Sequence, residues 1–193
     1  MTDDISFSRL ATLACHDLRT PLATVHGFAR TLEQIELEEP AAGYVAMIGQ
    51  ASSELAELID ELALAARIDG GRYDPEMRDV DSLELARAAA GRLGEDRVVV
   101  SGSGGTVRVD PDPAARSLAA LAQSALRHGG LETVELVVEV RELRVSPVTR
   151  AAAPVVLGEQ LRDLGAGVAV RHLRALGATL ELDGETLVVS LPG

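Results

Sequence analysis

The 193-residue sequence has no lysine and no tryptophan, one cysteine (Cys15) and only 2% aromatic residues. A single cysteine excludes an internal disulfide and a cysteine metal cluster. The scarcity of aromatic residues argues against a stacking platform for single-stranded nucleic acid. The net charge of −12 argues against nucleic acid more generally, because nucleic acid requires a basic surface. All 18 basic residues are arginine, so a mechanism that needs a lysine is excluded as well.

Long apolar runs are also absent. No stretch is long enough to cross a bilayer, and the N-terminal MTDDISFSRL is acidic and polar, unlike a secretory signal. We therefore expect a cytoplasmic protein that contacts no membrane. Hydrophobic residues nevertheless make up 47% of the chain, which is ample for a core built from leucine, valine and alanine.

Two helical stripes occupy the first 70 residues. Apolar residues recur every three or four positions from Phe7 to Leu32 and again from Tyr44 to Ala65. Pro40 and Gly43 lie in the break between them, and Gly70–Gly71 supplies a stop. The stripes predict a helical hairpin, residues 1–70, whose apolar face one hairpin cannot bury alone. We therefore expect a homodimer with a four-helix bundle.

The second half, residues 71–193, alternates irregularly between strand and helix patterns. Asp81 is a candidate cap for a helix near residues 82–93, and Asp183-Gly184 is a candidate hairpin turn. The predicted strands cover residues 71–80, 97–102, 106–110, 133–140, 142–146 and a closing hairpin at 178–192, and the predicted helices cover 82–93, 110–130, 158–165 and 167–177. This order favours a two-layer α/β sandwich, so the overall fold class is α+β.

The stretch CHDLRTPLATVHGF places His16 on the polar side of the first predicted helix. His16 lies two residues from Ala14 and two from Leu18, which both belong to the apolar face, so its imidazole is expected to face solvent. An exposed imidazole on a rigid helix is suited to act as a nucleophile or a proton carrier.

The neighbours of His16 suit that chemistry. Asp17 is able to accept the Nδ1 proton and leave Nε2 free, given a favourable rotamer. Arg19 and Thr20 follow at i+3 and i+4, on the same side of the helix. Pro21 removes the amide that would bond the carbonyl of Asp17, so a bend is expected one turn after His16.

The consecutive string His-Asp-Leu-Arg-Thr-Pro-Leu, residues 16–22, resembles the phosphoacceptor box of two-component histidine kinases. The resemblance extends over nearly the whole chain. Residues 1–70 look like the dimerisation and phosphoacceptor domain, and residues 71–193 look like the Bergerat-type ATP-binding domain. It implies that His16 is phosphorylated at Nε2 and passes the group to a response-regulator aspartate. It implies further that Asp17 is its hydrogen-bond partner or base, and that Asp17 and Thr20 together help to dephosphorylate the regulator.

The second half departs from that family at its ATP motifs. In the helix that should supply the Mg²⁺-binding asparagine, ALAQSALRHGG has Ala120 and Ser124 in place of the asparagines, although Arg127 and His128 fit. The segment LRVSPVTRAAAP has neither the acid nor the glycines of the adenine-binding motif. Gly165 and Gly167 remain before a helix, and we interpret them as close-packing positions rather than phosphate ligands. His26, His128 and His172 are interpreted as surface or helix-end residues, because no metal-like spacing links them.

These observations predict a degenerate ATPase-like domain that has lost ATP and magnesium binding, near Ser124, His128, Gly165 and Gly167. Because the chain begins almost at the box, we also expect it to lack a sensor segment. The function that this favours is a histidine phosphotransfer protein with receiver domains as partners and His16, Asp17, Arg19 and Thr20 as the site. Two alternatives stay open: an active sensorless kinase with a divergent ATP site, and a non-catalytic adaptor that binds response regulators.

Overall fold

The computed structural model describes residues 7–94 and 96–193 of the chain. The chain divides into two compact units, Met1–Tyr73 and Asp74–Gly193. The boundary expected from the sequence, between residues 70 and 71, lies in the short segment between the last helix of the first unit and Tyr73. Each unit buries hydrophobic residues of its own.

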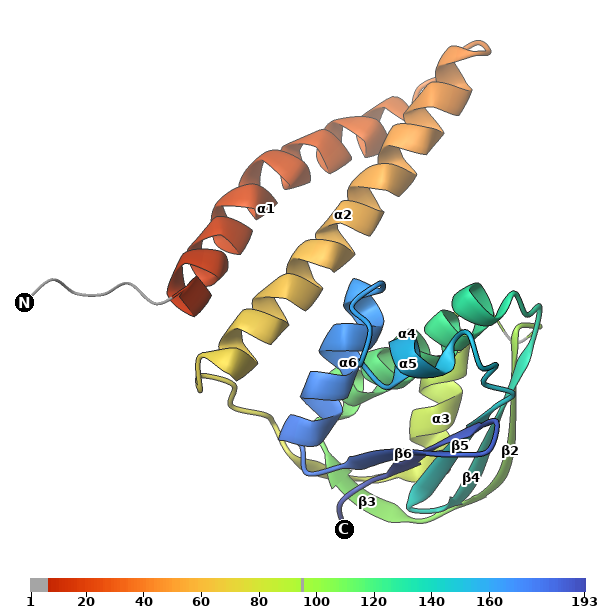
Figure 1. Ribbon diagram of the computed structural model, residues 1–193. Helices are drawn as coiled ribbons and strands as arrows, with labels where there is room; N and C mark the ends of the chain where they lie inside the picture. Colours follow the sequence, from red (N-terminus) through yellow and green to blue (C-terminus); the bar gives the residue numbers. More distant parts are fainter. Residues whose placement is uncertain (1–6, 95) are drawn as a thin grey trace, which may run out of the picture. The chain divides into compact units, whose positions relative to one another are not determined.

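The first unit is a hairpin of two long helices, α1 (Phe7–Leu32) and α2 (Ala41–Asp69), which pack against each other (Figure 1). Pro40 stands at the N-cap of α2. The helix ends at Gly70, whose amide donates to the carbonyl of Ala66 at 3.1 Å. The helical hairpin predicted from the two apolar stripes is therefore confirmed.

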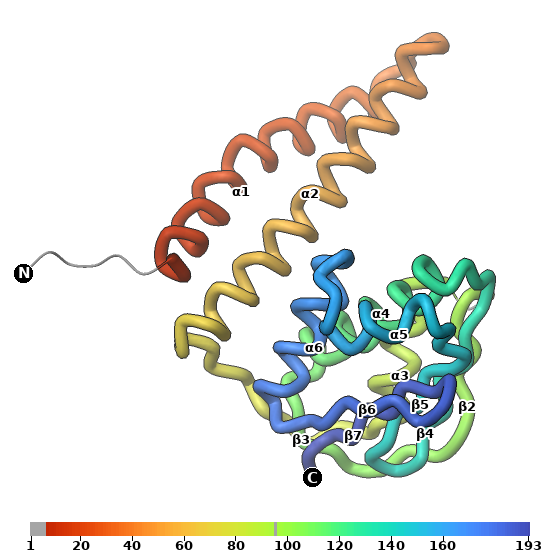
Figure 2. The backbone as a smooth tube through the Cα atoms, viewed as in Figure 1, coloured from red at the N-terminus to blue at the C-terminus, as the bar shows by residue number. Residues whose placement is uncertain are grey.

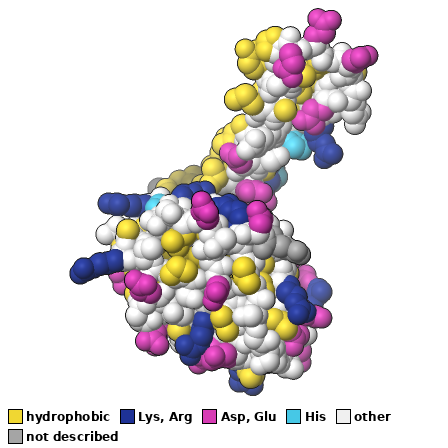
Figure 3. Space-filling view, turned by 90° about the vertical axis from the view of Figure 1, so that its right-hand side faces the viewer, with side chains coloured by type: hydrophobic (Ala, Val, Ile, Leu, Met, Phe, Trp, Pro, Cys, Tyr) yellow, Lys and Arg dark blue, Asp and Glu magenta, His cyan; other side chains and the backbone are white. Residues whose placement is uncertain are grey.

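The residues that the hairpin buries are mostly small. They are Cys15, Ala29, Val45, Gly49, Ser52, Ala63 and Ala66. The large apolar side chains instead stay exposed in the single chain, and Figure 3 shows hydrophobic side chains gathered along the hairpin. They include Leu10, Leu13, Leu18, Val25 and Phe28 on α1, and Tyr44, Met47, Ile48, Leu55, Leu58 and Leu62 on α2.

The second unit is built on a mixed sheet of five strands in the order β2-β4-β5-β7-β6. β2 pairs with β4 in parallel, and the other neighbours in this sheet are antiparallel. A separate antiparallel pair is formed by β1 and β3. The strands are β1 (Arg78–Asp81), β2 (Val98–Gly104), β3 (Thr106–Val109), β4 (Val134–Val140), β5 (Glu142–Ser146), β6 (Thr179–Asp183) and β7 (Thr186–Ser190).

Helices cover one face of the five-stranded sheet (Figure 1). They are α3 (Ser82–Gly91), α4 (Pro111–Gly129), the short α5 (Ala153–Val156) and α6 (Leu164–Ala175). Fully buried leucines from the helices and strands form the core between these layers: Leu118, Leu121, Leu126, Leu136, Leu143, Leu173 and Leu187. Inward-facing residues alternate along β5 and β7, as expected for a sheet with one covered face. The two-layer α+β sandwich is confirmed.

Local predictions in the second unit had mixed outcomes. Asp81 caps α3 by accepting from the amides of Leu83 and Glu84, as predicted. The predicted helix over residues 158–165 is wrong. Gly158 adopts a φ of +72°, which interrupts regular helix, and Asp163 instead caps α6, which begins at Leu164. The strand predicted over residues 71–80 is confined to Arg78 and the residues after it.

Candidate functional site

His16 lies on α1 with its side chain 77% exposed. Its Nδ1 is 3.2 Å from Oδ1 of Asp17, so the carboxylate favours the tautomer that carries the proton on Nδ1. Nε2 lies on the opposite edge of the ring. The arrangement leaves Nε2 facing solvent, where in this tautomer its lone pair is available for nucleophilic attack.

Asp17 is adjacent to His16 in the helix and is itself 68% exposed. Consecutive helical residues do not normally face each other, so the contact depends on the rotamers of the two side chains. An exposed pair of this kind contributes little to stability. The contact between Asp17 and the imidazole therefore does little to hold α1 together.

Arg19 is bound to the other helix of the hairpin. Its Nη2 is 2.7 Å and its Nε is 3.1 Å from Oδ1 of Asp60 on α2. The sequence analysis placed Arg19 beside His16 but did not identify Asp60. The heptad-like stripes do not fix the register between the two helices closely enough to pair these residues.

Thr20 and Pro21 lie one turn beyond His16. Thr20 is exposed, and its carbonyl accepts from Oγ1 of Thr24 at 3.1 Å. Pro21 stands inside α1, and Figure 2 shows that α1 curves along its length. A proline inside a helix removes one backbone hydrogen bond and bends the axis, which agrees with the bend expected from the sequence.

The second candidate region lies between α4 and α6. Ser124, at the position of the family's asparagine, is fully buried, and its Oγ has no hydrogen-bond partner among the described residues. His128 lies in the last turn of α4, as predicted. Gly165 and Gly167 both lie in the first turns of α6, and Gly167 is buried.

Asp163 connects these elements and was missed by the sequence analysis. Its Oδ1 accepts from the amide of Ala166 at 3.2 Å and so caps α6. Its Oδ2 lies 3.3 Å from Nε2 of His128 and 3.5 Å from Nη1 of Arg127. An aspartate just before a glycine-containing helix start is the sequence signal that could have revealed this cap.

The segment that follows β5 carries aliphatic side chains that are buried. Val148, Ala152, Val155 and Val156 are all buried, and α5 packs against both α4 and α6. Two surface hollows, of about 460 Å³ and about 240 Å³, lie elsewhere. The larger is lined by residues such as Val99, Glu135 and Pro147, and the smaller by residues of the hairpin loop such as Ile35 and Leu37.

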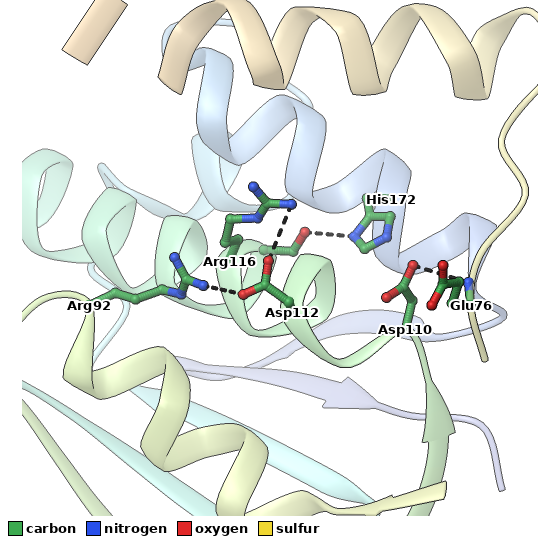
Figure 4. A network of polar contacts seen from close by, with 7 residues as sticks. Glu76, Arg92, Asp110, Asp112, Arg116 and His172 are labelled. Atoms are coloured by element: carbon green, nitrogen blue, oxygen red, sulfur yellow. Dashed lines mark hydrogen bonds and ion pairs between the residues drawn. The ribbon is translucent and has the colours of Figure 1, made fainter. Parts of the chain in front are cut away.

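His172 is fully buried, which corrects the prediction that it lies at the surface or a helix end. Its Nδ1 lies 2.8 Å from Oγ of Ser117 on α4 (Figure 4). Burial, with the nearby charge of Arg116, lowers the pKa of His172 from 6.5 to about 4. Arg116 is itself paired with Asp112, which also binds Arg92. The buried imidazole is therefore neutral at physiological pH.

His26 is half-buried in the hairpin rather than at the surface. Its Nδ1 lies 3.1 Å from Oγ of Ser52, which donates to the carbonyl of Gly49 at 2.8 Å. Within residues 7–94 and 96–193, no three His, Cys, Asp or Glu side chains are grouped to hold a metal ion. No helix among the described residues is long and apolar enough to span a membrane.

Comparison with known proteins identifies the first unit. Residues 8–71 match the family model of the His Kinase A (phospho-acceptor) domain. The chain is 30% identical over 142 residues to the sensor protein DivL of Caulobacter vibrioides, a match that covers 67% of this chain and 18% of DivL. The chain belongs to the two-component histidine kinase family. The phosphoacceptor resemblance of residues 16–22 is thereby confirmed at the level of the family.

Other members of the histidine kinase family match in sequence or fold. The sensor histidine kinase TrcS of Mycobacterium tuberculosis is 33% identical over 84 residues, which cover 42% of this chain and 16% of TrcS. The chain thus spans less than a fifth of the length of these two curated relatives.

Solved structures show the same fold. Full-length ShkA in complex with AMPPNP has a TM-score of 0.72 and 21% identity, and the match covers 97% of this chain and 46% of ShkA. The histidine kinase AdeS of Acinetobacter baumannii has a TM-score of 0.59 and 17% identity, over 92% of this chain and 97% of AdeS.

Proposed function

We propose that this histidine-kinase-like two-component protein is a histidine-containing phosphotransfer protein, which passes phosphoryl groups between His16 and response-regulator aspartates. The observation that carries the proposal is a contrast between the two units. His16 is exposed and lies 3.2 Å from Asp17, whereas the second unit has Ala120 and Ser124 where the family's nucleotide motif has asparagines.

The transfer step uses the exposed edge of the imidazole. The lone pair of Nε2 attacks the phosphorus of a regulator's aspartyl phosphate, the acyl P–O bond breaks, and the aspartate carboxylate leaves with the bonding pair. Nδ1 keeps its proton, and the positive charge on the phosphorylated ring is stabilised by Asp17. Attack by a second regulator's aspartate on the same phosphorus breaks the P–Nε2 bond, and the bonding pair returns to Nε2, which regenerates His16.

The residues of the second unit do not suit ATP with magnesium, which the family's fold implies. Ser124 is a short hydroxyl where an asparagine would hold the metal, and it is fully buried. Val148 and Ala152 fill the segment after β5 in place of an acid and glycines. The Asp163 carboxylate stands at the N-terminus of α6, where it opposes a triphosphate. We therefore propose that the chain does not bind ATP and magnesium.

The hairpin supports a homodimer within this proposal. Leu58 and Leu62 are 46% and 41% exposed in the single chain, and similar large side chains continue along both helices. An apolar stripe of this length is typical of a surface that packs against a second hairpin. Pairing two copies would place these side chains in a four-helix bundle and leave the His16 imidazoles outside.

The main alternative is an active kinase with a divergent ATP site. It is favoured by the likeness in fold to ShkA, whose structure was solved in complex with AMPPNP. A third function is a non-catalytic adaptor that binds response regulators without being phosphorylated.

One set of assays separates the three functions. Purified protein is titrated with Mg²⁺-ATP by calorimetry and, separately, mixed with a phosphorylated receiver domain and a second unphosphorylated one. A phosphotransfer protein gives no heat of ATP binding, acquires acid-labile phosphate on His16, and labels the second receiver. Micromolar ATP binding with autophosphorylation would establish the kinase, and absence of phosphate on His16 would establish the adaptor. His16→Gln is the matched control, because its side chain is exposed and its loss should not disturb folding.

A further inference from the structure

The five-stranded sheet of the second unit has one face that none of the described helices of this unit covers (Figure 1). The side chains of this uncovered face alternate with buried ones along β4, β5 and β7. Its charged side chains on β4, β5 and β6 are Glu135, Glu139, Glu142, Arg144, Glu181 and Asp183. Carboxylates outnumber arginines here, so the uncovered face is acidic and attracts a basic partner.

Arg144 shows how this face accommodates an arginine. Val137 on β4 and Val188 on β7 stand directly opposite it, and opposite neighbours in a sheet pack side by side. Its guanidinium pairs with two glutamates: Nη2 lies 2.9 Å from Oε2 of Glu142, and Nε lies 3.4 Å from Oε2 of Glu139. The aliphatic part of the side chain is thus placed beside valines, and the charged head is placed between carboxylates.

A hollow of about 460 Å³ near the start of β4 offers a similar set of groups. Glu135, which lines it, stands directly opposite Val99 on β2 and Ser146 on β5, and both of these line it too. Val99 is 52% exposed. Glu185, just before β7, also lines the hollow, and its carbonyl accepts from the amide of Val148 at 2.7 Å. The hollow therefore has an exposed valine, a hydroxyl and two carboxylates on a hydrogen-bonded backbone.

The two carboxylates of this hollow differ from those around Arg144 in one respect. Within residues 7–94 and 96–193, neither Glu135 nor Glu185 forms an ion pair, whereas Glu139 and Glu142 both hold Arg144. A metal ion does not account for them, because the described part of the chain groups no three His, Cys, Asp or Glu side chains as ligands. The group that matches a valine beside two unpaired carboxylates is a cationic side chain with an aliphatic stem.

We propose that the uncovered sheet face docks a basic segment of another protein, with an arginine of that segment in the hollow between Glu135 and Glu185. The stem of the arginine packs on Val99, and its planar guanidinium suits two carboxylates better than an ammonium does. The hairpin of a second copy does not fit this acidic surface, because residues 1–70 contain 12 acidic and 4 basic residues. The inference concerns the second unit alone and does not depend on phosphotransfer by His16.

The test titrates the full-length chain into a fluorescein-labelled peptide in which valine and arginine alternate, and follows fluorescence anisotropy at physiological ionic strength. The same peptide with citrulline in place of arginine keeps the shape of the side chain and lacks its charge. The wild type should bind the arginine peptide at least about tenfold more tightly than the citrulline peptide, because charge-assisted hydrogen bonds are the strong ones. The double variant Glu135→Gln/Glu185→Gln should lose most of this difference.

A matched control removes the same charge from positions outside the sheet. Glu84 and Glu159 are exposed, so Glu84→Gln/Glu159→Gln should change the affinity for the arginine peptide by less than about twofold, because salt screens distant charges. In the wild type, the amide chemical shifts that the peptide changes most should belong to the ends of β2, β4, β5 and β7 that line the hollow. The proposal is overturned if the wild type binds both peptides equally, if the two double variants lose the same affinity, or if the shift changes concentrate in α1 and α2. Circular dichroism verifies that both variants are folded.

Discussion

Nη2 of Arg19 lies 2.7 Å from Oδ1 of Asp60, so the arginine one turn beyond His16 is held by the opposite helix. Both side chains are about half exposed, and a pair of this kind contributes about 0.2–1 kcal/mol to stability. The ion pair therefore has a small role in folding, and it holds the Arg19 guanidinium against α2, one turn from His16.

We predict that Arg19→Gln slows phosphotransfer from an acidic receiver domain, whereas Asp60→Asn does not. The first substitution removes the charge, and the second leaves it free to contact the partner. The measurement is the initial rate of label transfer at two ionic strengths, since a charge effect weakens with salt. Equal rates for the two variants would show that Arg19 does not contact the regulator.

Asp17→Asn should slow transfer without abolishing it. The expected loss is about tenfold, the equivalent of about 1.4 kcal/mol for one hydrogen bond to a charged group. The rate constant of a single transfer from phosphorylated receiver to protein measures it. Abolition as complete as that in His16→Gln would instead assign Asp17 a direct chemical role.

Thr20→Ala should reduce the loss of phosphate to water more than it reduces transfer to a second receiver. Thr20 is exposed and one turn from His16, where it is able to position a water against a docked regulator. The comparison is the rate of inorganic phosphate release against the rate of transfer in the same reaction. Thr24→Ala is a suitable control, because that hydroxyl donates to the carbonyl of Thr20 and belongs to the same helix.

Replacing Leu58 and Leu62 by glutamate should dissociate the proposed homodimer. Each leucine is partly exposed in the single chain, and burying one completely is worth roughly 1.5–3 kcal/mol. Sedimentation velocity at micromolar concentration measures the effect, with Leu161→Glu as the control, since that exposed leucine lies in the second unit. A monomeric wild type at the same concentration would refute the dimer.

The lowered pKa of His172 predicts that the folded protein loses stability in acid. Its pKa is about 4 in the folded chain and near 6.5 when unfolded, so between these values the unfolded state binds more protons. Stability therefore falls as the pH drops from about 6.5 to about 4, by up to roughly 3 kcal/mol from this residue. Urea denaturation across this range measures the slope, and His172→Gln, which does not protonate, should flatten it. An unchanged slope in that variant would assign the acid sensitivity to other groups.

The sequence predicted the elements whose signals are local. The apolar stripes define α1 and α2, and Asp81 marks the start of α3 by its position before the helix. The short α5 has only four residues and no periodic pattern to reveal it. Its place is set by packing against α4 and α6, which depends on the tertiary fold.

In the candidate site, too, only the contacts between residues close in sequence could be predicted. His16 and Asp17 are consecutive residues of α1, so the sequence shows that they are near each other, whereas their contact depends on the rotamers of both side chains. The contact between Asp163 and the end of α4 joins residues more than thirty positions apart, and no local pattern pairs them. The burial of His172 similarly depends on how α6 rotates against α4.

The small residues inside the hairpin have a consequence for how the protein responds to dilution. Cys15, Ala29 and Ala66 bury little area, so α1 and α2 gain limited stability from each other within one chain. In the homodimer that we propose, the remaining apolar area is buried only on association, so folding of the hairpin is expected to obey mass action. The α/β sandwich has buried leucines of its own, so we expect its melting temperature to be independent of protein concentration. We therefore expect dilution to lower the melting temperature of the hairpin and to leave that of the α/β sandwich unchanged.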